Sequence, residues 1–341
     1  MKVLKNGPIG AIGTVRSFMN VVKDIDFEEV RDRAERTPRM LIVGRDEALA
    51  QEAATQLLGP VDRSGVSVEA WGDRESLDAT RYDVVIVYDP TGEGLFDRVR
   101  RAAGSRRDAA NVFFLAKEIS DGNDPANAVR MEIMDMLPDV APAFGRHYEE
   151  WRPAAVRAIV EQTSRANAQF ALVSNIPAVI PLLGGLVAAS ADLIVLTKNQ
   201  VMMCYKIAAA HDRGLEDQMA IVRELTPVVG AGFLWRTAAR EAASFIPFAA
   251  GTIPKVGIAF VGTMTVGKAA DYYYRFGKKP SKSQLDQFKE QASALLERLP
   301  FMKNEEKKDE QQTTVEAVSV SPNGSHDTEK IGQIEAETEK L

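Results

Sequence analysis

The stretch YDVVIVYD, residues 82–89, is rich in β-branched and aromatic residues, and GLFDRVRRAAG at residues 94–104 follows it with a helical pattern. Continuous apolar strands that alternate with helices are typical of a parallel sheet covered on both faces. We therefore predict a small three-layer α/β domain over residues 38–140. The same alternation of strand and helix patterns occurs on both sides of residues 82–104. The segments are RMLIVG (39–44), DEALAQEAATQLLG (46–59), VSVEAW (66–71) and NVFFLAKE (111–118).

Composition excludes several classes of protein. The chain has 341 residues and a net charge of -6, so it lacks the basic excess expected of a general nucleic-acid binder. Its single cysteine, Cys204, excludes an internal disulfide and a cysteine-built metal site. The three histidines, His147, His211 and His326, are scattered along the chain. We expect no metal, no cofactor and no enzymatic activity.

The rest of the chain divides by character. Residues 1–37 read as a helical lead-in, and residues 145–300 as a hydrophobic, all-α domain of helical hairpins broken by proline and glycine. Residues 151–174 are expected to form one long helix. Residues 303–341 are polar, poor in aromatic residues and rich in Glu, Lys and Gln, so we expect this tail to be disordered.

Two apolar runs dominate the helical domain. No charge occurs from Phe170 to Ala191, and the second run, residues 243–267, carries only Lys255. About 20 apolar residues are enough to span a bilayer, which predicts a transmembrane helix or hairpin. The alternative is a pair of hairpins buried in a soluble bundle, because the prolines break both runs. The residues expected to insert or pack are Ile176, Pro177, Ile180, Pro181, Leu182, Leu183, Gly184, Gly185, Phe245, Pro247, Phe248, Ile253, Pro254, Gly257 and Gly262.

Polar residues beside these runs are candidate contacts between helices. Asp192 and Lys255 are the charges closest to the apolar runs, and either they pair across the hairpins or each lies in water at a helix end. Lys198, Asn199 and Gln200 are polar amid apolar neighbours, so we expect them to form hydrogen bonds between helices.

Residues from about 150 to 280 resemble a known family. TSRANAQFALVSNIPAVIPLLGGLVAASADLIVLTKNQ and, further on, GFLWRTAAREAASFIPFAAGTIPKVGIAFVGTMTVGKAADYYYRFG are similar to the YcjF-like, GTPase-associated domain of unknown function. The resemblance implies paired apolar hairpins, association with a membrane and a GTPase domain on or beside the chain. It implies no catalytic residues.

That resemblance makes the α/β domain a candidate GTPase-like domain, but the motifs have degenerated. Leu49, Ala50 and Gln51 stand where a phosphate-binding loop after Gly44 needs Gly, Lys and Ser or Thr. GDRE replaces the D-x-x-G motif, and of the base-reading motif only Lys117 remains. We expect a degenerate Rossmann-like or GTPase-like domain that does not hydrolyse GTP.

Asp89 offers a second interpretation of the same domain. It ends a strand as the phosphorylated aspartate of a response-regulator receiver does, but Gly44 and Arg45 replace the acidic residues that hold magnesium there. A carboxylate in the DPTGEG turn is more simply explained as a cap on that turn.

The segment GTMTVGKAAD, Gly262–Asp271, has the spacing of a phosphate-binding loop, with Ala269 where a magnesium-binding hydroxyl belongs. It lies in an apolar stretch that becomes the aromatic cluster Tyr272–Tyr274. Gly257, Gly262 and Gly267 are therefore predicted to let helices approach closely, and Lys268 to reach a membrane surface.

The sequence predicts a non-catalytic, membrane-associated interaction or scaffold protein on the cytoplasmic face of the inner or plasma membrane. Its expected partners are a lipid bilayer, a GTPase or other protein, and further copies of itself. The alternatives are a weakly GTP-responsive switch, a subunit of an oligomeric membrane channel or transporter, and a soluble cytoplasmic protein.

Overall fold

The computed structural model describes residues 22–59, 64–105, 107, 109–118, 124–173, 185–226 and 252–298, and only the backbone of residues 185–193 and 252–255. By its contacts the chain divides into two units, Met1–Ala294 and Leu295–Leu341. The sheet and the helical region that follows it both lie in the first unit. The helical lead-in before residue 22 and the polar tail of residues 303–341 lie outside the described residues.

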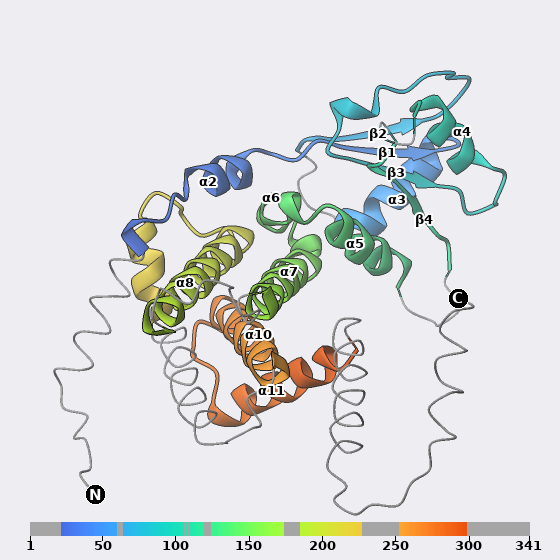
Figure 1. Ribbon diagram of the computed structural model, residues 1–341. Helices are drawn as coiled ribbons and strands as arrows, with labels where there is room; N and C mark the ends of the chain where they lie inside the picture. The colour runs from blue at the N-terminus through green and yellow to red at the C-terminus, as the bar shows by residue number, and fades with distance from the viewer. Residues whose placement is uncertain are drawn as a thin grey trace, which may run out of the picture. The chain divides into compact units, whose positions relative to one another are not determined.

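A four-stranded parallel sheet forms the first part of the fold, in the order β2-β1-β3-β4 (Figure 1). Met40 pairs with Val66 on one side and with Val84 on the other. The predicted α/β class is confirmed, because the β-branched runs form parallel strands separated by helices. The strands are β1 (Met40–Gly44), β2 (Val66–Ala70), β3 (Val84–Tyr88) and β4 (Val112–Leu115).

Helices cover both faces of the sheet (Figure 1). Helix α4 (Leu95–Ala102) packs on one face, where Leu95 and Val99 join the cluster of Leu41, Val43, Trp71, Val85 and Val87. Because side chains alternate along a strand, Met40, Ile42, Val84 and Ile86 face the other side. That side is covered by α3 (Glu47–Leu58) and α5 (Pro125–Met136). The crossover from β2 to β3 carries a single 3-10 turn, Ala79–Arg81.

A helical region contains α2, which precedes the sheet in the chain, and helices that follow the sheet. Helices α7 and α10 pack together most extensively, and α8 packs against both of them. Helix α2 lies against α6 and α8, where the Phe27 ring meets Tyr205 with 4.6 Å between ring centroids. The helices are α2 (Glu28–Glu35), α6 (Ala141–His147), α7 (Arg152–Val173), α8 (Gly185–Ala210), α10 (Thr252–Phe276) and α11 (Lys282–Leu296).

A buried seam joins the sheet to the helices. The Trp151 indole donates to the Leu57 carbonyl at 3.0 Å, and the Arg130 guanidinium donates to the same carbonyl at 3.1 Å, so two side chains satisfy the last turn of α3. The Tyr148 hydroxyl lies 3.1 Å from the Pro38 carbonyl oxygen and 2.8 Å from that of Ser64. We use the name seam for Arg130, Tyr148 and Trp151 with these carbonyls.

The predicted transmembrane helix is wrong for the part of the chain that the structure describes, where no helix is long and apolar enough to cross a membrane. The reason lies in the composition of the described helices. Helix α8 carries Lys198, Asn199 and Gln200, which lower its mean hydropathy, and α10 carries Lys268 and Asp271. Residues 174–184 of the first apolar run lie outside the described residues.

Candidate functional site at the carboxyl edge of the sheet

The strand order places a topological switch point between β1 and β3. The chain leaves β1 through α3 toward β2, and leaves β3 through α4 toward β4 on the opposite face. In open parallel sheets ligands bind in the crevice that this arrangement creates at the carboxyl ends of the strands. The candidate site is therefore built by the two turns that follow Gly44 and Tyr88.

The turn after β1 is tight and already holds a carboxylate. A Cβ on Gly44 would lie 2.4 Å from the backbone nitrogen of Ala50, so only glycine fits this close approach. The Asp46 carboxylate caps α3 by accepting from the Leu49 backbone N–H at 2.9 Å. The helix N-terminus that would receive a phosphate in a nucleotide-binding fold is thus occupied by the protein's own anion.

The turn after β3 is organised by Asp89, which is 6% exposed. Its carboxylate accepts from the backbone N–H groups of Leu95 at 2.8 Å and Glu93 at 3.2 Å. It also lies 3.4 Å from the Thr91 hydroxyl oxygen. Asp89 therefore has the structural role of capping this turn and the start of α4, as the simpler interpretation of the DPTGEG turn predicts.

An ion pair crosses from one turn to the other. The Arg45 guanidinium donates to the Glu93 carboxylate, and this contact raises the pKa of Arg45 and lowers the pKa of Glu93. Arg45 also lies 4.0 Å from the Asp46 carboxylate. Three carboxylates, those of Asp46, Asp89 and Glu93, thus share the neighbourhood of one guanidinium. This balance of charge opposes the entry of a polyphosphate.

The end of β3 adds another acidic contact. The Tyr88 hydroxyl donates to Glu52 of α3 at 2.9 Å. The pKa of Tyr88 is raised mainly by burial and further by this hydrogen bond. Within the described ranges, no group of three or more His, Cys, Asp or Glu side chains could hold a metal ion. The carboxylates at this edge are therefore used as caps and ion-pair partners.

A second polar constellation lies inside the helical region. The side-chain amide of Asn167 on α7 donates to the Thr263 hydroxyl of α10 at 2.9 Å, and the Gln200 amide of α8 donates to the same hydroxyl at 3.2 Å. The Asn199 amide donates to the Asn167 side-chain oxygen at 2.8 Å. We call Asn167, Asn199, Gln200 and Thr263 the polar layer. It links three helices whose residues are far apart in the sequence.

The structure describes only some of the other predicted contact residues, and for several of these only the backbone. Lys198 is partly exposed on α8. Asp192, Ile253, Pro254 and Lys255 lie on helical backbone whose side chains are not described, so the pairing of Asp192 with Lys255 stays a prediction. Gly185 begins α8, and Gly257 and Gly262 lie in α10. Outside the described residues are Ile176, Pro177, Ile180, Pro181, Leu182, Leu183, Gly184, Phe245, Pro247 and Phe248.

The segment Gly262–Asp271 lies wholly within α10, so it has no phosphate-binding loop. A Cβ on Gly267 would lie 2.6 Å from the Val160 side chain of α7, which shows that this glycine allows the close approach of two helices. The Lys268 ammonium donates to the Gln291 side chain of α11 at 2.6 Å, and burial lowers the pKa of Lys268. Lys268 therefore makes a contact between helices in this structure.

Sequence reasoning missed a charged cluster at the end of α8. The His211 Nε2 lies 2.8 Å from the Asp271 carboxylate, and the His211 ring stacks on Tyr274 with 5.5 Å between centroids. Arg275 lies 3.6 Å from the same carboxylate. No local motif marks this group, because His211 and Asp271 are 60 residues apart.

No protein-family model, curated protein or solved structure matches this chain. The resemblance of residues 150–280 to the YcjF-like domain therefore stays a prediction. The function of the chain has to be inferred from its residues and their geometry.

Proposed function

We propose that this chain is a non-catalytic interaction protein that works at a membrane surface and carries a nucleotide-type fold with a closed ligand crevice. The observation that carries the proposal is the Arg45–Glu93 ion pair, which joins the two turns of the switch point. Asp46 and Asp89 cap the two helices that begin there.

The chemistry of the crevice supports the non-catalytic part of this proposal. Nucleotide hydrolysis at a phosphate-binding loop uses a lysine at the phosphates and a magnesium ion held by a hydroxyl and a carboxylate. Leu49 and Ala50 lie in the first turn of α3 and offer neither charge nor hydroxyl. The carboxylate of Asp46 already accepts the N–H that a phosphate would use.

Equilibrium binding of fluorescent GTP and GDP, with magnesium and with chelator, tests this part. We expect no saturable binding at millimolar nucleotide for the full chain. Arg45→Ala supplies the matched variant, because it opens the ion pair without changing either strand. Saturable binding that Arg45→Ala weakens would overturn the closed crevice and favour the GTP-responsive switch.

The membrane part of the proposal depends on the two apolar runs and on what borders them. Val173, the last described residue of α7, is 64% exposed, and Ile194 on α8 is 43% exposed. Apolar surface next to apolar segments is typical of sites that meet another protein or a membrane. We propose attachment to one side of the bilayer through this end of the helical region.

Fractionation of the expressed full chain tests the attachment. We expect the protein to sediment with membranes and to need detergent, or alkaline carbonate, for its release. Val173→Ser with Ile194→Ser should increase the released fraction, whereas Met136→Ser, at another exposed apolar residue, should not. A chain that stays in the supernatant from the start would contradict membrane attachment and favour the soluble alternative.

A further inference from the structure

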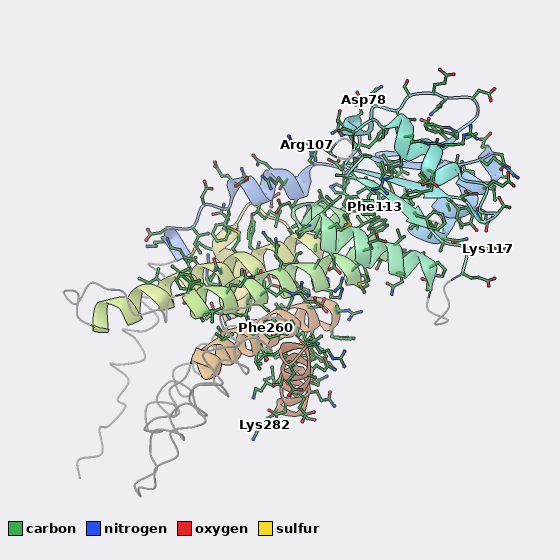
Figure 2. The ribbon with its side chains drawn as sticks, turned by 45° about the vertical axis from the view of Figure 1, so that its right-hand side comes forward. Asp78, Arg107, Phe113, Lys117, Phe260 and Lys282 are labelled. Atoms are coloured by element: carbon green, nitrogen blue, oxygen red, sulfur yellow. The ribbon has the colours of Figure 1, made fainter. Side chains whose placement is uncertain are left out.

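Four exposed arginines gather around α4. Arg98, Arg100 and Arg101 lie on this helix, and Arg107 lies on the loop that leads to β4. Figure 2 shows Arg107 in the sheet region, whereas Phe260 lies among the helices of the other region. We call these four arginines, together with Phe96 and Phe114, the arginine surface.

Among the described residues, none of the four arginines forms an ion pair with Asp or Glu, although the Asp97 carboxylate lines the same hollow as Arg100 and Arg101. Most arginines that the structure describes form an ion pair with Asp or Glu, from Arg31 in α2 to Arg275 in α10. Within the described ranges, the arginines that lack such a partner are Arg81, Arg298 and the four of the arginine surface. A concentration of unpaired guanidinium groups in one place produces a local positive potential on a chain whose net charge is -6.

Aromatic side chains lie beside the arginines. The rings of Phe96 and Phe114 are 5.5 Å apart between centroids, and the Arg100 guanidinium lies 5.9 Å from the centre of the Phe96 ring. Phe114 is 40% exposed, although its neighbours Phe113 and Leu115 on β4 are buried. Arginine and aromatic residues together are the composition of protein interfaces, where they contribute most of the binding energy.

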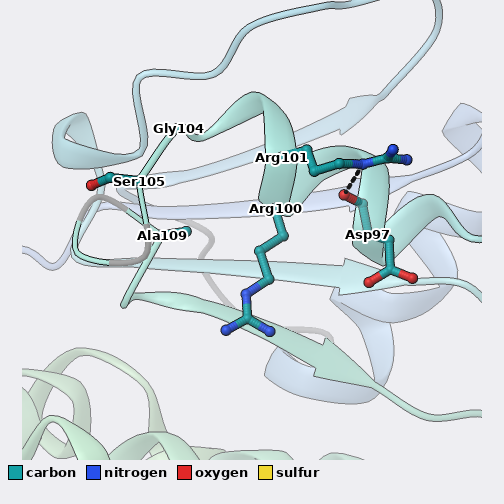
Figure 3. Close-up of a pocket in the computed structure, with 6 residues that line it drawn as sticks. All are labelled: Asp97, Arg100, Arg101, Gly104, Ser105 and Ala109. Atoms are coloured by element: carbon teal, nitrogen blue, oxygen red, sulfur yellow. Dashed lines mark hydrogen bonds between the residues drawn. The ribbon is translucent and has the colours of Figure 1, made fainter.

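The shape of the surface favours an extended ligand. A shallow hollow of about 550 Å³ lies here, and Figure 3 shows Arg100 and Arg101 leaving α4 in different directions. The Arg101 Nε donates to the Asp97 carbonyl at 3.1 Å, and this bond orients the Arg101 side chain. Guanidinium groups that diverge cannot enclose one small anion, but they can contact successive carboxylates of an extended chain. The hollow is lined by Asp97, Arg100, Arg101, Gly104, Ser105 and Ala109.

The arginine surface lies away from the proposed membrane contact. Helix α4 covers the sheet face opposite to α3 and α5, and it is α3 that the seam binds. Helix α7 starts at this seam and runs for 22 residues, about 33 Å, before it reaches Val173. A chain attached to a bilayer beyond Val173 therefore keeps its arginine surface accessible to a soluble partner.

We propose that the arginine surface is the docking site for an extended acidic segment of a partner protein. The inference rests on the proposed scaffold function and names the chemistry of its partner. Carboxylates of the segment pair with Arg100, Arg101 and Arg107, and an apolar side chain of the segment packs on Phe114 and Phe96. Paired guanidinium and carboxylate groups give the site its charge specificity.

The test measures the binding of a short fluorescent peptide of glutamate and phenylalanine to the full chain by anisotropy, beside a peptide with glutamine for glutamate. We expect the glutamate peptide to bind more tightly and to weaken as salt rises. Arg100→Gln with Arg101→Gln should raise its Kd by at least about tenfold. Phe114→Ser should raise the Kd with an unchanged dependence on salt.

The matched control is Arg165→Gln with Arg223→Gln, which removes the same charge from exposed arginines that have acidic partners. We expect the control to bind like the parent chain, and all variants to keep the parent far-UV circular dichroism and melting temperature. Equal binding of the two peptides, or equal losses in test and control variants, overturns the proposal.

Two other polyanions complete the test. Vesicles of phosphatidylglycerol and a short DNA duplex are measured with the same variants. If Arg100→Gln with Arg101→Gln weakens either of these and not the glutamate peptide, the surface binds lipid or nucleic acid and the acidic-segment proposal is overturned. Failure of this inference leaves the nucleotide and fractionation results unchanged, because neither depends on these arginines.

Discussion

Beneath α4 the sheet has a core of apolar side chains, among them Leu41, Val43, Val85 and Val87, whereas the helical region contains the polar layer around Asn167. The buried charged side chains described in the sheet region are Asp89 and Arg130, and both cap the ends of elements. In the helical region, Asn167, Gln200 and Thr263 instead form hydrogen bonds between helices. The buried polar side chains there are Ser164, Asn167, Thr197, Gln200 and Thr263.

The two regions differ in what fixes the alignment of their strands or helices. Strands are aligned by backbone hydrogen bonds and by the alternation of their two faces. Helices satisfy their backbone hydrogen bonds internally, so no backbone hydrogen bond fixes how far one helix is shifted along another. Moving α7 by one turn would separate Asn167 from Thr263 and leave both buried without these partners. The polar layer thus favours one alignment of α7, α8 and α10.

The largest expected effect is at the seam, where the two kinds of core meet. Trp151→Ala should lower the free energy of unfolding by about 3–5 kcal/mol, because it removes a fully buried ring and the donor to the Leu57 carbonyl. Trp151→Phe keeps most of the ring and should cost about 1–3 kcal/mol. Urea unfolding followed by circular dichroism measures both. Equal, small losses would show that the seam does not stabilise the joined regions.

Next in size is the polar layer. Asn167→Leu should cost about 2–4 kcal/mol, because it leaves the Asn199 amide and the Thr263 hydroxyl without this partner. Replacing the three buried members together, by Asn167→Leu with Gln200→Met and Thr263→Val, should recover part of that loss, because only the amide of the half-buried Asn199 then lacks its partner. Urea unfolding of the two variants decides the matter. A combined variant as unstable as the single one would mean that the layer stabilises by packing rather than by paired hydrogen bonds.

A smaller effect is expected where α10 approaches α7. Gly267→Ala should destabilise by about 1–2 kcal/mol, because the new Cβ would meet the stiff, branched side chain of Val160. In a Val160→Ala background the same change should be neutral or stabilising, since alanine favours the helix. A double-mutant cycle from melting curves measures the coupling. Additive losses would contradict the close approach.

The smallest expected effect is a dependence of stability on alkaline pH. Burial raises the pKa of Cys204 from 9.0 to about 12. Burial is also the main reason that the pKa of Tyr205 is raised from 10.0 to about 12. Both groups bind protons more tightly when folded, so their stabilisation is complete below pH 9 and is lost as the pH rises toward 12. Cys204→Ala should flatten this decline in unfolding measurements across the window. An unchanged decline would mean that other groups cause it.

Most of the fold was readable from local patterns. The apolar runs at residues 39–44 and 82–89 locate β1 and β3, and Gly59 ends α3 as the sequence indicates. The helix predicted over residues 151–174 is α7, Arg152–Val173. These features depend on neighbours in the sequence, so one chain is enough to predict them.

The contacts of the candidate sites were not readable in the same way. Arg45 and Glu93 are 48 residues apart, and Asn167 and Thr263 are 96 apart. The sequence marks Asn199 and Gln200 as polar among apolar residues, but it does not say which side chains face them. The transmembrane prediction failed for the described helices because a count over the apolar runs leaves out the polar residues, such as Lys198 and Asn199, that share a helix with them.

The seam also sets the order in which this chain can fold during synthesis. The Tyr148 hydroxyl bonds to the carbonyl of Pro38, 110 residues earlier, and Trp151 bonds to Leu57, 94 residues earlier. Contacts of such sequence separation form late and slow folding. All four strands leave the ribosome before these two side chains do. Until then, the carbonyls of Pro38 and Leu57 lack the hydrogen bonds that Tyr148 and Trp151 donate. A fragment cut near residue 140 would remain in that state, and a self-sufficient sheet fragment should extend past Trp151.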